Sequence, residues 1–506
     1  MLAIRERKEG GKIMSQLAQN KKKNTVYYVV CVLCILLMFL GGFIPSFAPE
    51  ITVAGMQILS IYVALIILWS TIGGVLWPSI LAIVALGISE YTNINGAITS
   101  ALGQNVIWQI LFAIALTQGL SATGAGEFIA KWFISRKFLK GRPYLFTWIL
   151  FLVFAVLGAI SSAIGMILLS WTILNSIADH VGVKNSERYF RIMSIFMVVN
   201  TCVGEQIIIY KNWPMGLWTA FGKMANMELD YIPFMIIAAV ISLFFTLVLT
   251  LIIKIARVDV SFLKTFDNTK IRESMANVRM NKVQIGFLVT LLACIVFSLG
   301  TSIFPRGSVL YTFCNKVSPA GAFAVAVAAL IFLKNKEGKP VLDFPKVMGS
   351  SPFWSAFMIC AASIPLANAL CNEATGFTAW ISRVLTPVFE NSSLWVIYFI
   401  IIFVTLVLTN IASCSGVGFM MLPIAVPLAT AAGANMYLVG VCTIYTCLFG
   451  FILPGSSGLS AMMYGMKEKQ SLTVKEILIY TSIPCLIFLI IACIGFPLLD
   501  MSGMFG

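Results

Sequence analysis

Two short polar segments interrupt long apolar runs of this chain, and they resemble copies of one another. The first is Gly158–Gly165 and the second is Thr409–Gly418. Ser161 lies 252 residues before Ser413, and the two Ala-Thr-Gly triplets of the chain are separated by the same offset. This shared offset predicts a chain built from two repeats, each with a polar break inside an apolar span.

The composition places these breaks in a membrane. Hydrophobic residues make up 59% of the 506 residues and charged residues only 11%, against about 25% charged in soluble domains. Apolar runs long enough to cross a bilayer recur along the chain, so we expect an all-α polytopic membrane protein. The predicted spans lie near 26–45, 51–69, 72–88, 143–179, 190–210, 232–256, 283–304, 309–333, 393–430, 436–464 and 477–498.

Polar breaks at membrane depth restrict the fold, because lipid offers the backbone no hydrogen-bond partner. Such a break persists only where protein buries it or where it lines a cavity. Paired broken helices are a sequence signature of the binding site in secondary transporters. The alternative is that the small residues of each break only allow close packing of helices.

The same order of elements occurs twice. Residues 105–135 and 352–386 each consist of two apolar pieces around a Gly-containing polar tip, and we interpret both as re-entrant hairpins. We expect each piece to be about ten to fourteen residues long, too short to cross alone. A long run with a Ser/Gly break follows each hairpin. The predicted divisions are a basic arm (1–24), a first half (25–257), a polar linker (258–281), a second half (282–500) and a short tail (501–506).

The net charge of +14 comes largely from basic loops beside the spans. Basic loops are retained on the cytoplasmic side, so we expect a multi-pass protein of the cell (inner) membrane with a cytoplasmic N-terminus. The bilayer is then the partner of this charge, and no nucleic-acid partner is expected. The single histidine, His180, excludes a multi-His metal site, and no organic cofactor is expected. An intramembrane enzyme or a channel is a less favoured alternative, because no catalytic set or filter-like sequence is present.

A break in a helix offers places for ions of both signs. The N-terminus of the second piece presents free N–H groups that favour an anion, and the C-terminus of the first presents free carbonyls that favour a cation. Serine hydroxyls serve either ion. We therefore predict a small anionic substrate beside Na⁺ as the coupling ion. The predicted substrate-binding residues at the breaks are Ser161, Ser162, Ala163, Ser413, Cys414 and Ser415.

Hairpin, broken helix and polar span, occurring twice, resemble the divalent anion/Na⁺ symporters of the ion transporter superfamily. That family carries Ser-Asn-Thr at both breaks, where this chain has Ser161-Ser162-Ala163 and Ser413-Cys414-Ser415. The resemblance implies inverted repeats, alternating access, a homodimer and no enzyme activity. The implied cation-binding residues are Thr409, Ala412, Ser413 and Ser456 in the second half and Ser161 and Gly204 in the first. Both asparagines of the motif are replaced here, so the usual dicarboxylate specificity is not carried over.

Several polar residues outside the motif are further candidates. Glu205 follows Gly204 in an apolar span, and such carboxylates are functional candidates. It could carry a coupling proton or pair with Lys211. Asn368 and Asn372, near the second hairpin tip, could bind substrate or stabilise the turn. The sequence thus predicts cation-coupled uptake of a small organic or inorganic anion. The alternative is a proton-coupled organic acid exchanger or a cation/proton antiporter that uses Glu205.

Overall fold

The computed structural model describes most of the chain, and its regular structure is helical. The described residues are 25, 27–71, 75–228, 230–264, 269, 273, 278–335, 337–349, 351–370, 372–389 and 392–505. Within these ranges the strand-like pairing is one isolated bridge between Lys334 and Pro340. The predicted all-α class is confirmed. The predicted basic arm, 1–24, lies outside the described residues.

Elements of the first half follow the predicted spans. A helix over Tyr27–Phe43 comes first. The elements after it are α2 (Val53–Thr71), α3 (Leu76–Ile88), α4 (Ile94–Leu102), α5 (Asn105–Ala122), α6 (Ala125–Ile134), α7 (Pro143–Ile160), α8 (Ala163–Val181), α9 (Arg188–Glu205), the 3-10 turn η3 (Ile209–Lys211), α10 (Pro214–Met224) and α11 (Tyr231–Ile255).

The second half begins with a capped helix. Asn281 and Gln284 exchange side-chain and backbone hydrogen bonds, which fixes the start of α13 at Lys282. The elements are α13 (Lys282–Ser298), α14 (Gly300–Ile303), α15 (Val309–Phe332), α16 (Phe344–Met348), α17 (Ser351–Leu370), the 3-10 turn η5 (Glu373–Thr375), α18 (Phe377–Phe389), α19 (Leu394–Ile411), α20 (Cys414–Ala432), α21 (Met436–Cys447), α22 (Gly458–Gly465) and α23 (Val474–Met501).

The helices have the lengths and surfaces of membrane spans. Among the described residues, eight helices are long and apolar enough to cross a bilayer, and six shorter apolar helices accompany them. One face of α11 is exposed although it is apolar, which is costly in water and normal against lipid. The exposed residues of that face are Ile236, Val240, Leu243, Leu247 and Leu251. The chain is therefore a multi-pass membrane protein.

Each run that carries a Ser/Gly break forms two helices separated by two extended residues. Ser161 and Ser162 separate α7 from α8, and Ala412 and Ser413 separate α19 from α20. The second break lies 251 residues after the first (162 to 413). The offset of 252 is therefore one residue too long at the breaks, and Ser162, not Ser161, is the counterpart of Ser413.

The same corrected register continues to the end of both broken helices. α8 and α20 are each 19 residues long, and each ends at a glycine in the left-handed conformation, Gly182 and Gly433. These glycines are again 251 residues apart. The offset of 252 holds at the hairpin turns, where Gly124 and Gly376 have φ of 74° and 70°. The connection between hairpin and broken helix is thus one residue shorter in the second half.

The two predicted hairpins have arms of unequal length. α5 and α17 span 18 and 20 residues, whereas α6 and α18 span 10 and 13. The prediction that every arm is too short to cross is wrong for α5, which is long enough by itself. The apolar part of α17 in the described residues, Phe357–Leu370, belongs to the shorter helices. Polar residues such as Gln118 and Ser121 remain helical because they tolerate helical dihedrals, and the helix ends only near the glycine with positive φ.

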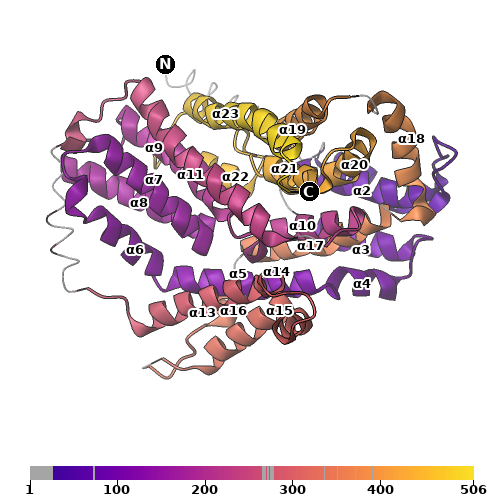
Figure 1. Ribbon diagram of the computed structural model, residues 1–506, viewed down its shortest axis with the longest axis horizontal. Helices are drawn as coiled ribbons and strands as arrows, with labels where there is room; N and C mark the ends of the chain where they lie inside the picture. Colours follow the sequence, from indigo (N-terminus) through magenta and orange to yellow (C-terminus); the bar gives the residue numbers. More distant parts are fainter. Residues whose placement is uncertain are drawn as a thin grey trace, which may run out of the picture.

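The broken helices of the two repeats lie toward opposite ends of the molecule (Figure 1). α7, α8 and α9 form one end, α18, α19 and α20 lie toward the other, and α5, α10 and α17 run between them. α17 contacts both α5 and α10, and α13 and α15 pack against α5. This central group of helices joins the two repeats.

Candidate functional site

The first break is closed from one side by a lysine. Lys211 follows the end of α9 on the 3-10 turn η3, and its side chain is only 3% exposed. Its ammonium group donates to the carbonyl of Gly158 and, at 2.7 Å, to the carbonyl of Ser161. The carbonyl of Gly158 lies in the last turn of α7 and that of Ser161 directly follows the helix, where carbonyls lack an intrahelical partner. A fixed cation therefore satisfies the C-terminal end of this break.

A carboxylate meets the other end of the same break. Oε1 of Glu205 accepts a hydrogen bond of 3.2 Å from the backbone N–H of Ala163, the first residue of α8. Glu205 is 8% exposed, and the side chain of Asn212 approaches the same carboxylate. Negative charge at a helix N-terminus is stabilised by the free N–H groups and the helix dipole. Both ends of the first break thus carry a complementary side-chain charge.

The first hairpin contacts this break directly. Nε2 of Gln118 donates to the hydroxyl of Ser162 at 3.1 Å, and the hydroxyls of Ser121 and Ser161 are 2.7 Å apart. Both hairpin residues lie near the end of α5. The sequence marked this stretch as a polar tip but did not assign Gln118 or Ser121 to the site. Their position beside a Gly-containing turn was the signal available.

In the part of the chain that the structure describes, no charged side chain meets either end of the second break. The N–H of Cys414, the first residue of α20, donates to the backbone carbonyl of Ser456 at 2.8 Å. The hydroxyls of Ser413 and Ser415 are 3.0 Å apart, and the hydroxyl of Thr409 donates to the carbonyl of Cys447 at 2.6 Å. In the second break, neutral groups therefore occupy the places where charged side chains lie in the first break.

Asn410 fixes the loop that follows α21. Its amide nitrogen donates to the carbonyls of Leu406 and Phe449, both at 2.9 Å. Its carbonyl oxygen accepts from the N–H groups of Phe451 and Ile452, both at 3.0 Å. All hydrogen-bonding capacity of this buried amide is used, so Asn410 is a positioning residue for residues 449–452.

Oxygens converge beside Gly450. A Cβ atom added to this glycine would lie 3.1 Å from the carbonyl oxygens of both Thr409 and Ser456. Small cations such as Na⁺ bind to carbonyl and hydroxyl oxygens, and both kinds are present here. The described residues contain no group of three or more His, Cys, Asp or Glu side chains that could hold a metal ion. A cation at this place would rely on neutral oxygens.

A single cavity of about 500 Å³ reaches both breaks. It brings together seven of the predicted residues, Ser161, Ser162, Ala163, Glu205, Ser413, Cys414 and Ser415. Its walls also include Gln118, Lys211, Asn212 and, from α17, Ser355 and Ile359. The predicted cation-binding residues Thr409, Ala412, Ser456 and Gly204 do not line this cavity. Thr409 and Ser456 lie directly behind it, at the convergence of oxygens beside Gly450.

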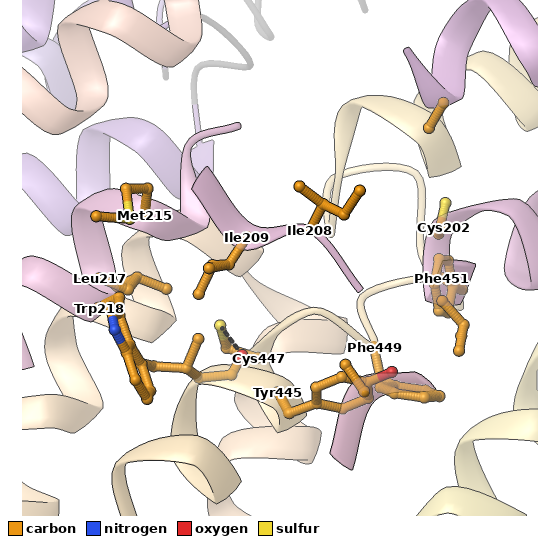
Figure 2. Close-up of a cluster of buried hydrophobic side chains, with 14 of the residues drawn as sticks. Cys202, Ile208, Ile209, Met215, Leu217, Trp218, Tyr445, Cys447, Phe449 and Phe451 are labelled. Atoms are coloured by element: carbon orange, nitrogen blue, oxygen red, sulfur yellow. Dashed lines mark hydrogen bonds between the residues drawn. The ribbon is translucent and has the colours of Figure 1, made fainter. Parts of the chain in front are cut away.

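Apolar packing supports the two interrupted spans that flank the cavity. Figure 2 shows Ile208 and Ile209, after α9, in one buried cluster with Phe449 and Phe451, after α21. Cys202 of α9 belongs to the same cluster and, with Phe451, also lines the cavity. The non-helical segments of both repeats are therefore held against a common apolar core.

The second hairpin turn lies away from the cavity. Asn372 accepts a hydrogen bond of 3.0 Å from Ala374 within its own turn, and Asn368 is partly exposed on α17. The turn docks on the start of α2, where Thr52 donates to the carbonyls of Ala374 and Thr375 at 2.7 and 3.2 Å. The structure does not bring Asn368 or Asn372 to the residues of either break.

Comparisons with known proteins agree with this architecture. Residues 22–499 match the family described as the sodium:sulfate symporter transmembrane region. An uncharacterized transporter of Caenorhabditis elegans is 25% identical over 177 residues, which are 34% of this chain and 29% of that protein. The chain therefore spans less than a third of that relative's length. The crystal structure of the YdaH transporter of Alcanivorax borkumensis is similar in fold, with a TM-score of 0.52 and 11% identity over 81% of this chain and 89% of that chain.

Proposed function

Because this chain belongs to the sodium:sulfate symporter family and is a secondary transporter rather than an enzyme, we propose that it takes up a small organic or inorganic anion together with a cation by alternating access. The observation that supports this proposal is the cavity that reaches both helix breaks. The positive end of the α20 helix dipole suits an anion there. The substrate-binding residues proposed for this break are Ser413, Cys414 and Ser415.

The coupling ion proposed is Na⁺, and its place is beside Gly450. The carbonyl oxygens of Thr409 and Ser456 meet there, and the hydroxyls of Ser413 and Ser415 lie in the same break. A cation at the end of α19 next to an anion at the start of α20 would neutralise it, so binding of each ion would favour the other. This mutual stabilisation is a physical basis for coupled transport.

We further propose that the protein lies in the cell membrane as a homodimer, with its N-terminus in the cytoplasm. Chemical cross-linking in native membranes should give a dimer, and a protease-sensitive tag at the N-terminus should be protected in right-side-out vesicles.

Uptake into proteoliposomes tests the transport proposal. An inward Na⁺ gradient should drive accumulation of a labelled organic anion. Without the gradient, the anion should only equilibrate slowly across the membrane. In the alternative, with proton coupling through Glu205, a pH gradient drives accumulation and Glu205→Gln abolishes it. A conductance that needs no gradient and shows no accumulation would overturn both forms of the proposal.

A further inference from the structure

Two opposite charges are buried in the wall of an otherwise uncharged cavity. Glu205 and Lys211 are the only charged residues among the described residues that line it. No direct ion pair joins them within the described part of the chain, because each group faces a different end of the first break. Burial of charged side chains in a membrane protein is costly, so both charges need a role or a strong local partner.

Each charge occupies the place that the helix break offers to an ion of the same sign. The ammonium of Lys211 is bound by the carbonyls of Gly158 and Ser161, at the cation-favouring end of α7. The carboxylate of Glu205 accepts from Ala163, at the anion-favouring end of α8. A cation and an anion from solution would bind to these same carbonyl and N–H groups.

The second break lacks such an internal pair. Its lining residues on α20 and in the loop before α22 are uncharged, from Ser413 and Ser415 to Ser457. The N–H equivalent to that of Ala163 belongs to Cys414 and donates to a neutral carbonyl. The repeats therefore differ in one respect. Charged side chains occupy the two ends of the first break, whereas the described residues place none at the second.

We propose that Glu205 and Lys211 permanently fill the first half of the binding site, so that the transported anion carries a single charged group and binds with Na⁺ at the second break alone. This inference rests on the proposed transport function and specifies its substrate class. A monocarboxylate fits such a site. A dicarboxylate or sulfate would bring a second negative charge toward Glu205, with no free cation site in the first break to compensate it.

Paired substrates of equal length test this assignment on the wild-type protein. Uptake into proteoliposomes should be supported by butyrate and not by succinate or sulfate at equal concentration. The dependence on Na⁺ should have a Hill coefficient of about 1, as expected for one cation site. Preference for succinate or sulfate over butyrate overturns the inference while leaving the transport proposal intact. Absence of Na⁺-driven or pH-driven uptake of every anion overturns both.

Variants of the two charged residues give the second part of the test. Glu205→Ala frees the N–H of Ala163 and leaves Lys211 as a cation in the site, so the ratio of succinate to butyrate uptake should rise at least about tenfold. Glu127→Ala is the matched control. Glu127 is an exposed carboxylate on α6, paired with Lys131 at 2.6 Å, and its loss should leave the ratio unchanged.

Removal of the lysine should expose a cation site. Lys211→Ala leaves the carbonyls of Gly158 and Ser161 free, so thermal stability should become dependent on Na⁺ and the Hill coefficient should rise toward about 2. Lys131→Ala is the control and should show neither change. An unchanged substrate ratio in folded Glu205→Ala, or stability of Lys211→Ala that is indifferent to Na⁺, contradicts the inference. If either variant fails to fold, the preference of the wild-type protein between butyrate and succinate decides whether the inference holds.

Discussion

Asn410 offers the sharpest test of how the second break is built. Asn410→Leu removes four hydrogen bonds and leaves two backbone groups without a partner, the N–H groups of Phe451 and Ile452. The carbonyl of Phe449 keeps the thiol of Cys485 as a donor at 3.5 Å. The carbonyl of Leu406 also loses a bond, but it remains a helix acceptor. We expect a loss of folding stability together with a loss of Na⁺-dependent uptake, because the loop leads to Ser456.

The size of the effect follows from the count of groups left unpaired. Each buried unpaired group costs about 1–3 kcal/mol, so two groups cost about 2 kcal/mol at the lower limit, which is appropriate where the adjoining cavity admits water. A change of about 2 kcal/mol shifts the folding equilibrium by roughly thirtyfold.

Asn200 supplies the control. It is 1% exposed, but its side chain donates one hydrogen bond of 2.7 Å, to the carbonyl of Phe151, and its own carbonyl oxygen has no partner among the described residues. Asn200→Leu should therefore cost at most about 1 kcal/mol. Denaturant unfolding of the purified protein measures both variants. Equal destabilisation by Asn410→Leu and Asn200→Leu would refute the view that the four bonds of Asn410 hold the loop.

Three further variants test other features of the structure. Gly450→Ala places a methyl group 3.1 Å from two carbonyl oxygens. It should raise the Na⁺ concentration needed for half-maximal uptake at least about tenfold, with the fold preserved. An unchanged Na⁺ dependence of uptake would mean that the cation binds elsewhere. A Cβ at Gly376 meets the backbone of Glu50 and Ile51, just before α2, and this glycine has positive φ. Gly376→Ala should therefore destabilise by more than the roughly 1–2 kcal/mol of dihedral strain expected for Gly141→Ala, whose Cβ meets nothing within 4 Å; thermal unfolding should rank the two in that order. Thr52→Val removes the 2.7 Å bond to the same hairpin turn and the 3.1 Å bond that the Thr52 hydroxyl accepts from the N–H of Gly55. It should cost about 1–3 kcal/mol for the two bonds; a larger loss in the same assay would show that more than these two bonds is disrupted.

Much of the fold can be predicted from the sequence, because a lipid bilayer imposes few and simple constraints on a chain. Apolar length predicts the spans, and a polar break at membrane depth predicts a broken helix. Both breaks form as predicted, and the match to the symporter family confirms the resemblance drawn from them. The pairing of Ser161 with Ser413 is wrong by one residue, because a common offset cannot detect a one-residue difference in a connecting segment.

The contents of the first break are harder to predict. Lys211 lies six residues after Glu205, a spacing that does not place two side chains together on a helix. The chain leaves the helix between them, and this unwinding turns the ammonium back toward α7. Asn368 and Asn372 illustrate the opposite case, since their polar character predicted a ligand role and neither residue lines the cavity that reaches the breaks. Their roles as substrate ligands stay predictions.

The charges of the first break also bear on the electrical behaviour of transport. Lys211 and Glu205 sum to zero, and both are covalently part of the repeat that holds them. Whatever motion carries the site across the membrane, this pair moves no net charge in either direction. The current per cycle is therefore decided at the second break, where one singly charged anion with one Na⁺ would make uptake insensitive to the membrane potential.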